Sequence, residues 1–199
     1  MKIYFHINID SFSNCYLVVD EQSGRAVIID PGKISEELLS KIEGNGYTLE
    51  AVLITHNHSG HTKGLSTLRK IYDVAVYAAD LGVAKNPASV IRGEGTLRIA
   101  GLNVSYFSLP GHSSDSMVFK IGNVLFTGDT IEAGTIGGTS SSYARRTLIF
   151  GIRSKILSQH DDTIIMPGHG PMTSVGAEKM FNIDVVRGGY NKKRFSEKR

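Results

Sequence analysis

The sequence contains little that would form covalent cross-links or cross a membrane. Its 199 residues include one cysteine, Cys15, so an intrachain disulfide is excluded. Cys15 begins an apolar run, where a buried structural thiol is expected. No apolar run is long enough to span a bilayer, and residues 1–10 lack the apolar core of a signal peptide. We therefore expect a cytoplasmic protein in which any metal site is built without thiolates.

The sequence also lacks a strong excess of charge of either sign. It has 22 Lys and Arg against 19 Asp and Glu, and 41% hydrophobic residues suit one domain with a substantial core. Residues 187–199 hold six basic residues and one acid, so the remainder is slightly acidic. A short basic segment on a non-basic body disfavours nucleic acid as a partner. We expect a domain at residues 1–183 and a basic tail at 184–199, either solvated or contacting an acidic partner or neighbouring subunit.

Hydrophobic periodicity predicts strands and helices that recur in two similar blocks. The first block is expected to hold strands at residues 3–9, 15–20, 26–30, 50–54 and 74–78, and helices at 35–42 and 65–71. The second is expected to hold strands at 97–100, 102–109, 116–121, 123–127 and 163–166, and helices at 143–158 and 175–181. Residues 79–95 should form a short helix and loop, and the Gly- and Ser-rich residues 133–142 a loop. This order predicts an α/β fold of two sheets with helices outside.

Three histidines follow the strand expected at residues 50–54, in the run Thr55-His-Asn-His-Ser-Gly-His. His56 and His58 are two residues apart, so in extended backbone their side chains leave the same side of the chain. Both can therefore bind one metal ion, while Gly60 permits a turn that lets His61 reach a second ion. A solvated loop would explain one such histidine. Three of the seven histidines in six residues indicate a metal site instead.

Three more polar residues follow later strands, each directly after a glycine. They are His112, Asp129 and His169. Each alone would be an ordinary turn residue, but side chains at strand ends can project into a shared cleft. The combined set supplies ligands for two metal ions: His56, His58, His61, His112, Asp129 and His169. The other two histidines, His6 and His160, lack this context and are expected to be structural or surface residues.

These motifs resemble those of the metallo-β-lactamase superfamily. The matching runs are Thr55-His-x-His-x-x-His, Pro110-Gly-His, Thr127-Gly-Asp and Gly168-His-Gly, with Asp30-Pro-Gly at the family's early turn. The resemblance implies an αββα sandwich, two mixed β-sheets flanked by helices, with metals at one edge between the sheets. It also implies one ion bound by His56, His58 and His112, a second bound by His61 and His169, and Asp129 bridging them. Asp30 would hold a ligand imidazole in one tautomer.

One position departs from the family's pattern, His-x-His-x-Asp-His. The aspartate position is Gly60 here, whereas in the family's hydrolases that aspartate binds the second ion and holds the nucleophilic hydroxide. Two divalent ions bring four positive charges, and a single carboxylate among the ligands offsets one of them. The site should therefore attract an exogenous anionic bridge, hydroxide or peroxide, and the second ion should have an open coordination position.

A further run resembles the flavodiiron proteins, the oxygen- and nitric-oxide-reducing branch of the superfamily. His112-Ser-Ser-Asp-Ser-Met matches their His-x-x-Asp-Ser-Met, so we expect Asp115 to support the ligands, although a turn-capping aspartate would also fit. His58 stands where flavodiiron loops carry Glu. Together these features resemble the stand-alone oxygen-binding di-iron proteins that pair with cytoplasmic chemoreceptors.

This second resemblance implies a sensor of oxygen and iron that binds O2 as a bridging peroxide on two iron ions. Zinc or manganese would suit the same ligands. The implied partner is a cytoplasmic chemoreceptor or another signalling protein, and a homodimer is compatible with it. On this interpretation the chain is a non-hydrolytic sensor, not a metallo-hydrolase.

A glyoxalase II-type thioester hydrolase is the competing interpretation. Gly128-Asp-Thr, Gly134-Thr-Ile-Gly and residues 162–176 are similar to the second half of those enzymes. Gly60 argues against it, as does the absence of a C-terminal helical region that binds glutathione. A β-lactamase proper is disfavoured by the short, cytoplasmic chain. A metal-poor binding module is the least favoured class, because a decayed site would not be expected to keep six ligands.

Overall fold

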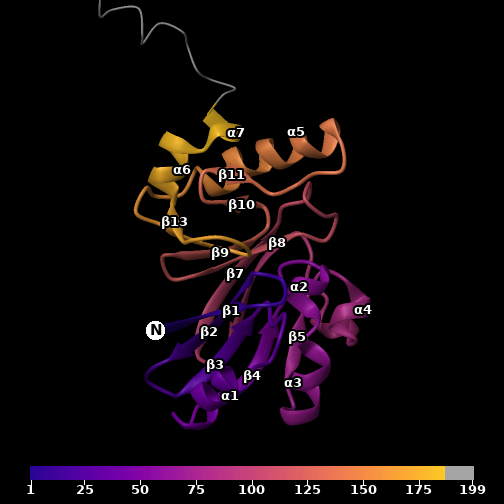
Figure 1. The fold of residues 1–199 in the computed structure, drawn as a ribbon, viewed down its shortest axis with the longest axis vertical. Helices are drawn as coiled ribbons and strands as arrows, with labels where there is room; N and C mark the ends of the chain where they lie inside the picture. The colour runs from indigo at the N-terminus through magenta and orange to yellow at the C-terminus, as the bar shows by residue number, and fades with distance from the viewer. Residues whose placement is uncertain (187–199) are drawn as a thin grey trace, which may run out of the picture.

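Two β-sheets lie face to face and helices cover their outer faces in a computed structural model that describes residues 1–186 (Figure 1). Helices α1 and α3 flank one sheet, and α5, α6 and α7 lie on the opposite side of the molecule. The predicted αββα sandwich with two mixed sheets is therefore confirmed. Each sheet comes from one half of the chain, so any site at their shared edge draws residues from both halves.

The first sheet has the order β1-β2-β3-β4-β5, with β1 to β3 antiparallel and β3 to β5 parallel. Its strands are β1 (Lys2–Asn8), β2 (Ser13–Asp20), β3 (Arg25–Ile29), β4 (Thr48–Leu53) and β5 (Ala75–Tyr77). Its helices are α1 (Glu36–Glu43), α2 (Ser59–Thr62), α3 (Leu65–Ile71) and α4 (Leu81–Ala84), followed by the 3₁₀ helix η1 (Pro87–Ser89). Ser35 caps α1 by accepting from the Leu38 N–H at 3.1 Å, which fixes where this helix begins.

The second sheet has the order β13-β12-β9-β8-β7-β6, with only the β12–β9 pair parallel. Its strands are β6 (Glu94–Ile99), β7 (Leu102–Ser108), β8 (Met117–Ile121), β9 (Val124–Gly128), β12 (Ile164–Pro167) and β13 (Thr173–Ser174). A separate hairpin is formed by β10 (Ile131–Glu132) and β11 (Thr135–Ile136). The helices are α5 (Ser142–Gly151), the π-helix η2 (Ile152–Ile156), α6 (Val175–Phe181) and α7 (Ile183–Val186).

Three apolar layers hold the sandwich together, and strand alternation assigns residues to them. In β2, Tyr16 and Val18 face the layer between the sheets, while Leu17 and Val19 face α1 and α3. The third layer lies between the second sheet and α5 to α7. Because β2 is buried on both faces, it is a continuous apolar run without the alternation typical of a half-exposed strand.

The structure differs from the sequence-based expectations mainly in the second half. The expected loop at 133–142 includes β11, and β10 precedes it directly. The helix expected at 143–158 changes from α5 to the π-helix η2 after Gly151, a poor helix former. There Ser154 Oγ donates to the Phe150 carbonyl at 2.9 Å, a bond that competes with the helical backbone pattern. Of the basic tail expected at 184–199, residues 184–186 belong to α7, and the rest lies outside the described residues.

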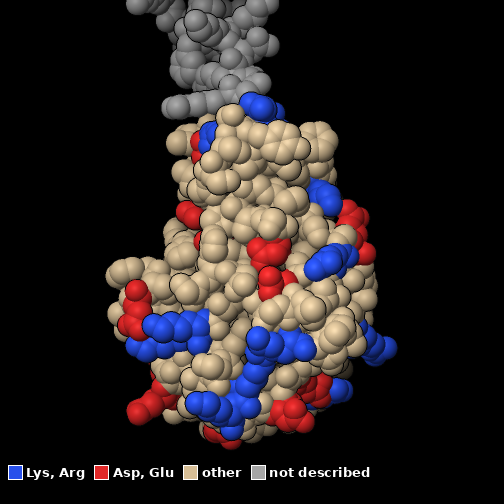
Figure 2. All heavy atoms as spheres, turned by 90° about the vertical axis from the view of Figure 1, so that its right-hand side faces the viewer, with Lys and Arg blue, Asp and Glu red and all other residues tan. Residues whose placement is uncertain are grey.

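Surface charge is mixed on the face shown in Figure 2, where blue and red side chains alternate over the half built by the first sheet. The half built by the second sheet carries fewer charges on that face. Across residues 1–186, no helix combines the length and apolar character that a membrane crossing requires.

Candidate metal centre

The six side chains expected to bind metal lie together where strands of both sheets end. His56, His58 and His61 follow β4, Asp129 follows β9, and His169 follows β12. His112 lies in the turn between β7 and β8. They form two groups of potential ligands that share Asp129: His56, His58, His112 and Asp129 in the first cluster, and His61, Asp129 and His169 in the second. The structure thus brings together every ligand expected from the sequence.

The donor atoms of the first cluster are spaced like the ligands of one tetrahedral ion. His58 Nδ1 lies 3.0 Å from His56 Nε2 and 3.1 Å from His112 Nε2. Asp129 Oδ2 lies 3.6 Å from His56 Nε2 and 3.7 Å from His112 Nε2. Ligands about 2.1 Å from a tetrahedral ion lie about 3.4 Å apart. The measured separations lie within about 0.4 Å of this value, so the four atoms fit one metal ion.

The second cluster uses the other oxygen of the same carboxylate. Asp129 Oδ1 lies 2.9 Å from His169 Nδ1 and 3.5 Å from His61 Nε2. Within residues 1–186, His61 Nε2 is the one fully buried side-chain nitrogen or oxygen without a hydrogen-bond partner. A buried polar atom without a partner is costly in free energy. A metal ion shared with Asp129 and His169 would satisfy it, so the residues of this cluster also fit a metal.

Asp30 determines which nitrogen of two histidines faces the clusters. Its carboxylate accepts hydrogen bonds from Thr55 N at 2.8 Å, Thr55 Oγ1 at 2.6 Å and His61 Nδ1 at 3.0 Å. Since the Thr55 hydroxyl donates to Asp30, it accepts from His56 Nδ1, which lies 3.0 Å away. Both imidazoles therefore carry their proton on Nδ1 and leave Nε2 free for a metal.

His112 is oriented from the other half of the chain. Its Nδ1 donates to the Gly138 carbonyl at 2.8 Å, which leaves Nε2 facing the first cluster. Gly138 follows the β10–β11 hairpin, so this hairpin sets the orientation of a ligand. Sequence reasoning did not predict the roles of Gly138 or Thr55, because each depends on a contact with a segment distant in the chain, His112 for Gly138 and Asp30 for Thr55.

The electrostatics of the metal-free clusters favour a proton on His61. Burial alone would lower the pKa of His61, but the Asp30 and Asp129 carboxylates outweigh burial and raise this pKa to about 10. Burial and the neighbouring His61 instead lower the pKa of His56 to about 3. Burial would raise the pKa of Asp129, yet His169 and His61 hold it well below its usual range. Without metal, His61 of the second cluster therefore holds a proton, and a metal cation that binds there must displace it.

The loop that carries the histidines is held from two sides. Asp115 accepts from the Asn57 N–H at 2.8 Å, so it contacts the backbone between His56 and His58, while its support of the ligands themselves stays a prediction. Ser13 Oγ donates to the Gly60 carbonyl at 2.5 Å. A Cβ atom at Gly60 would lie 3.3 Å from Ser11 Cβ, and Gly60 does not have a positive φ. A side chain at position 60 would therefore require only a small movement of Ser11.

The glycine that precedes His169 is required by the site itself. A Cβ atom at Gly168 would lie 2.2 Å from Asp129 Oδ1 and 2.7 Å from His61 Cε1. Any larger residue would push the shared Asp129 carboxylate out of place. The two other histidines lie outside the clusters: His6 Nε2 contacts Ser35 Oγ at 3.2 Å, and the His160 side chain is 93% exposed.

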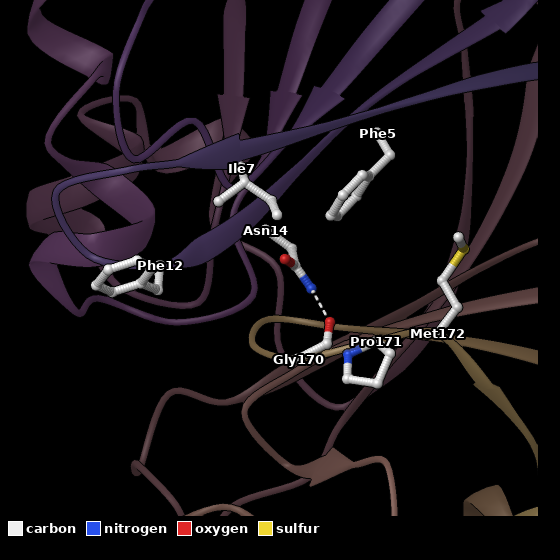
Figure 3. Close-up of a pocket in the computed structure, with 7 residues that line it drawn as sticks. All are labelled: Phe5, Ile7, Phe12, Asn14, Gly170, Pro171 and Met172. Carbon is white, nitrogen blue, oxygen red and sulfur yellow. Dashed lines mark hydrogen bonds between the residues drawn. The ribbon is translucent and has the colours of Figure 1, made fainter.

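An apolar pocket of about 500 Å³ is lined by residues of β1 and β2 and by the segment that follows His169 in the chain (Figure 3). Its lining residues are Phe5, Ile7, Phe12, Asn14, Gly170, Pro171 and Met172. Asn14 Nδ2 donates to the Gly170 carbonyl at 2.8 Å and to the Pro167 carbonyl at 2.9 Å. These bonds tie β2 to the segment that carries His169. A ligand in the pocket would therefore contact Gly170, the residue that follows His169 in the chain.

Comparison with known proteins agrees with this geometry. The family description "Metallo-beta-lactamase superfamily" matches residues 9–169. The hydroxyacylglutathione hydrolase GloC of Haemophilus influenzae is 33% identical over 193 residues, which cover 85% of this chain and 91% of that protein.

Two solved structures also share the fold. The BLEG-1 B3 metallo-β-lactamase has a TM-score of 0.82 and 26% identity, covering 92% of this chain and 99% of that one. TTHA1623 in a di-iron-bound form has a TM-score of 0.72 and 29% identity, covering 90% and 98%. The chain, with its paired His and Asp clusters at the edge between two sheets, belongs to the metallo-β-lactamase superfamily.

Proposed function

We propose that this chain holds two iron ions, binds dioxygen reversibly at the metal pair, and acts as an oxygen and iron sensor. The observation that carries the proposal is the donor set of the second cluster. That cluster has His61, His169 and the shared Asp129, while position 60, an aspartate in the family's hydrolases, is glycine. A hydrolase would need that aspartate to hold its nucleophile.

The charge of the site favours binding of a small ligand at the metal pair over hydrolysis of a bound substrate. Two divalent ions would bring four positive charges, and Asp129 is the single carboxylate among the grouped ligands. Neutral imidazoles offset none of this charge, so the site attracts an added electron-rich ligand. When bound, the metal pair would supply the electrons and the open coordination position that dioxygen requires.

The chain's own residues would keep this site rigid and its chemistry mild. Asp30 and Gly138 fix the imidazoles of His61 and His112 through Nδ1, the ring nitrogen that does not face the clusters. A carboxylate-poor donor set stabilises high-valent iron weakly, which favours reversible binding over turnover. The di-iron-bound relative supports iron, although the same ligands accept zinc or manganese.

A sensor also needs an output. We propose a cytoplasmic location and a signalling partner such as a cytoplasmic chemoreceptor, with a second copy of the chain as the other possible contact. The excess of basic residues in 187–199 supports an acidic partner surface. Co-purification with and without these residues tests the contact, and equal recovery of the partner would exclude a role for them.

Thioester hydrolysis is the second candidate, because GloC is a named hydroxyacylglutathione hydrolase and the residues that follow His169 line an apolar pocket. The pocket would take the acyl part of a thioester. Under this alternative the protein would retain zinc and cleave thioesters despite Gly60.

Anaerobic loading with iron followed by addition of air distinguishes the two functions. We expect about two irons per chain, one for each cluster, and a visible absorption band that forms in air and disappears on deoxygenation. Irreversible bleaching to ferric protein, or preferential retention of zinc together with thioester cleavage, would overturn the sensor proposal.

Restoring the aspartate tests the role of position 60 directly. Gly60→Asp should strengthen metal binding at the second cluster and raise the thioesterase rate, since Ser11 needs to move only slightly. Gly60→Ala is the matched control, because it adds the Cβ atom without the carboxylate. Equal metal content and equal rates in both variants would contradict this interpretation of the missing aspartate.

A further inference from the structure

Two glycines flank His169 and leave the backbone at this ligand with little stiffness of its own. Gly168 precedes His169, and Gly170 follows it with a positive φ of 75°. Glycine has more conformational freedom than other residues, so ordering a ligand between two glycines costs more entropy. The ladder between β12 and β9 also shifts register between Met166 and Pro167, just before this segment. Contacts from other parts of the chain must therefore fix His169 in place.

The beginning of β2 supplies such contacts through one residue, Asn14. Asn14 Nδ2 donates to the Pro167 carbonyl at 2.9 Å and to the Gly170 carbonyl at 2.8 Å, the second of which is drawn in Figure 3. The Asn14 backbone N–H donates to the Gly168 carbonyl at 2.7 Å. A single residue therefore binds backbone carbonyls on both sides of His169.

Asn14 is itself held by the core of the sandwich. It is 2% exposed and pairs with Ile7 of β1. Tyr16, two residues further along β2, leaves the strand on the same face and donates its hydroxyl to the same Pro167 carbonyl at 2.7 Å. The Tyr16 ring packs against that of Phe126, with the ring centroids 5.3 Å apart. The packing between the sheets thus sets the position of both donors.

The opposite side of the segment faces the end of β9. The Gly168 N–H donates to the Gly128 carbonyl at 2.8 Å, and His169 Nδ1 lies 2.9 Å from Asp129 Oδ1. β2 therefore holds the carbonyls of the segment, while the end of β9 contacts its N–H and its imidazole. If the bonds to β2 were lost, the distance between His169 and Asp129 would no longer be fixed from both sides.

We propose that Asn14 is a positioning residue, which holds His169 where the second metal ion requires a ligand beside Asp129 and His61. Asn14 belongs to neither group of donor atoms, and its amide is neutral. It therefore acts on the metal through the placement of His169 and not through charge or direct coordination. This inference rests on the proposal that the two clusters hold two metal ions.

Titration of the metal-free protein with Co²⁺ alone tests the inference without relying on activity. Co²⁺ accepts imidazole and carboxylate ligands, and its visible absorption bands depend on the number and arrangement of those ligands. His169→Ala identifies the bands of the second ion, because His169 belongs to the second cluster alone.

We expect Asn14→Ala to weaken binding of the second Co²⁺ about 10- to 100-fold, the usual effect of losing a residue that orients a ligand. The bands of that ion should change, while the affinity and bands of the first ion stay as in wild type. A role limited to stability would lower the unfolding midpoint and leave the bands of both ions unchanged. Asn14→Ser, whose hydroxyl keeps at most one of the two amide bonds, takes its place if Asn14→Ala does not fold.

Asn123→Ala is the matched control. Asn123 Nδ2 also donates to a backbone carbonyl, that of Asp162 at 3.1 Å, but both residues precede β9 and β12, at the opposite end of these strands from the ligands. Its Co²⁺ affinities and bands should equal those of wild type.

A second Co²⁺ bound by the folded Asn14 variant with the affinity and bands of wild type would overturn this inference alone. A wild-type protein that binds fewer than two Co²⁺ ions would overturn both this inference and the proposed two-metal function.

Discussion

At the scale of single residues, the metal centre depends on which nitrogen of each histidine carries a proton. Asp30 fixes this for His61 directly and for His56 through the Thr55 hydroxyl. One carboxylate therefore serves both clusters. Asp30 itself has a positive φ of 52°, a conformation that Asp tolerates better than most residues, and this supports a specialised role.

Metal binding should release a proton from His61 even at pH 8. Its raised pKa of about 10 means that this imidazole is still protonated there, whereas an ordinary histidine would be neutral. The metal must displace that proton, so binding should release at least one proton per chain. Calorimetry in two buffers of different ionisation enthalpy measures the release.

Asp30→Asn should reduce this proton release and weaken metal binding at the second cluster about 10- to 100-fold. Asp10→Asn is the control, because Asp10 pairs with Lys33 at the surface and belongs to neither cluster. If Asp30→Asn releases as many protons and binds metal as tightly as wild type, the role given to Asp30 is contradicted.

Substitution of single ligands should separate the two clusters. His61→Ala or His169→Ala should leave about one metal ion per chain, while Asp129→Ala should disturb both positions because its two oxygens serve different clusters. Elemental analysis of the purified variants measures the occupancy, with His160→Ala as an exposed control. Two ions retained in all three ligand variants would disprove the assignment.

At the scale of elements, the C-terminal helices stabilise the hairpin that orients His112. Glu178 is 2% exposed, and its carboxylate accepts from the Gly134 N–H of the hairpin at 3.1 Å, from Thr173 Oγ1 at 2.7 Å and from Asn182 Nδ2 at 2.6 Å. Its surroundings are donors, so a side-chain amide would place an N–H against other N–H or O–H groups.

Glu178→Gln should therefore lower the free energy of unfolding by about 1–3 kcal/mol. Urea denaturation of the metal-free protein measures this change. Glu37→Gln should change the stability by less than about 0.5 kcal/mol, as expected of a surface position. Equal stability of both variants would show that the Glu178 hydrogen bonds do not hold the hairpin in place.

At the scale of the whole molecule, the metal centre joins two halves that are otherwise held by the apolar layer between the sheets. The first half supplies His56, His58 and His61, and the second supplies His112, Asp129 and His169. A ligand that binds the folded state alone stabilises it, by about 2.7 kcal/mol at a concentration one hundred times its Kd.

Metal-loaded protein should therefore unfold at a higher temperature than protein stripped with a chelator, in a single transition. Differential scanning calorimetry of both forms measures the shift. The His61→Ala variant should show a smaller shift, since it keeps only the first cluster. Unfolding temperatures that do not depend on metal would contradict a site shared between the halves.

Local sequence predicted most of the elements that carry the site. The helices at 65–71 and 175–181 were predicted with their observed bounds, and β2, β7 and β8 to within two residues at either end, because each is a strong apolar pattern. The hairpin β10–β11 was not predicted. Its strands have two residues each, too short for a periodic signal, and distant groups on α6 and α7 hold them.

The sequence by itself determined the family, the ligand types and the missing aspartate at position 60, because these are properties of residue identity and spacing along single segments. Tertiary structure decided that Asp30, expected to orient one ligand imidazole, acts on His61 directly and on His56 through Thr55, and that Gly138 orients His112. Each of these contacts joins residues from separate segments of the chain. Only the packing of two sheets and their helices brings such residues within hydrogen-bonding or electrostatic range.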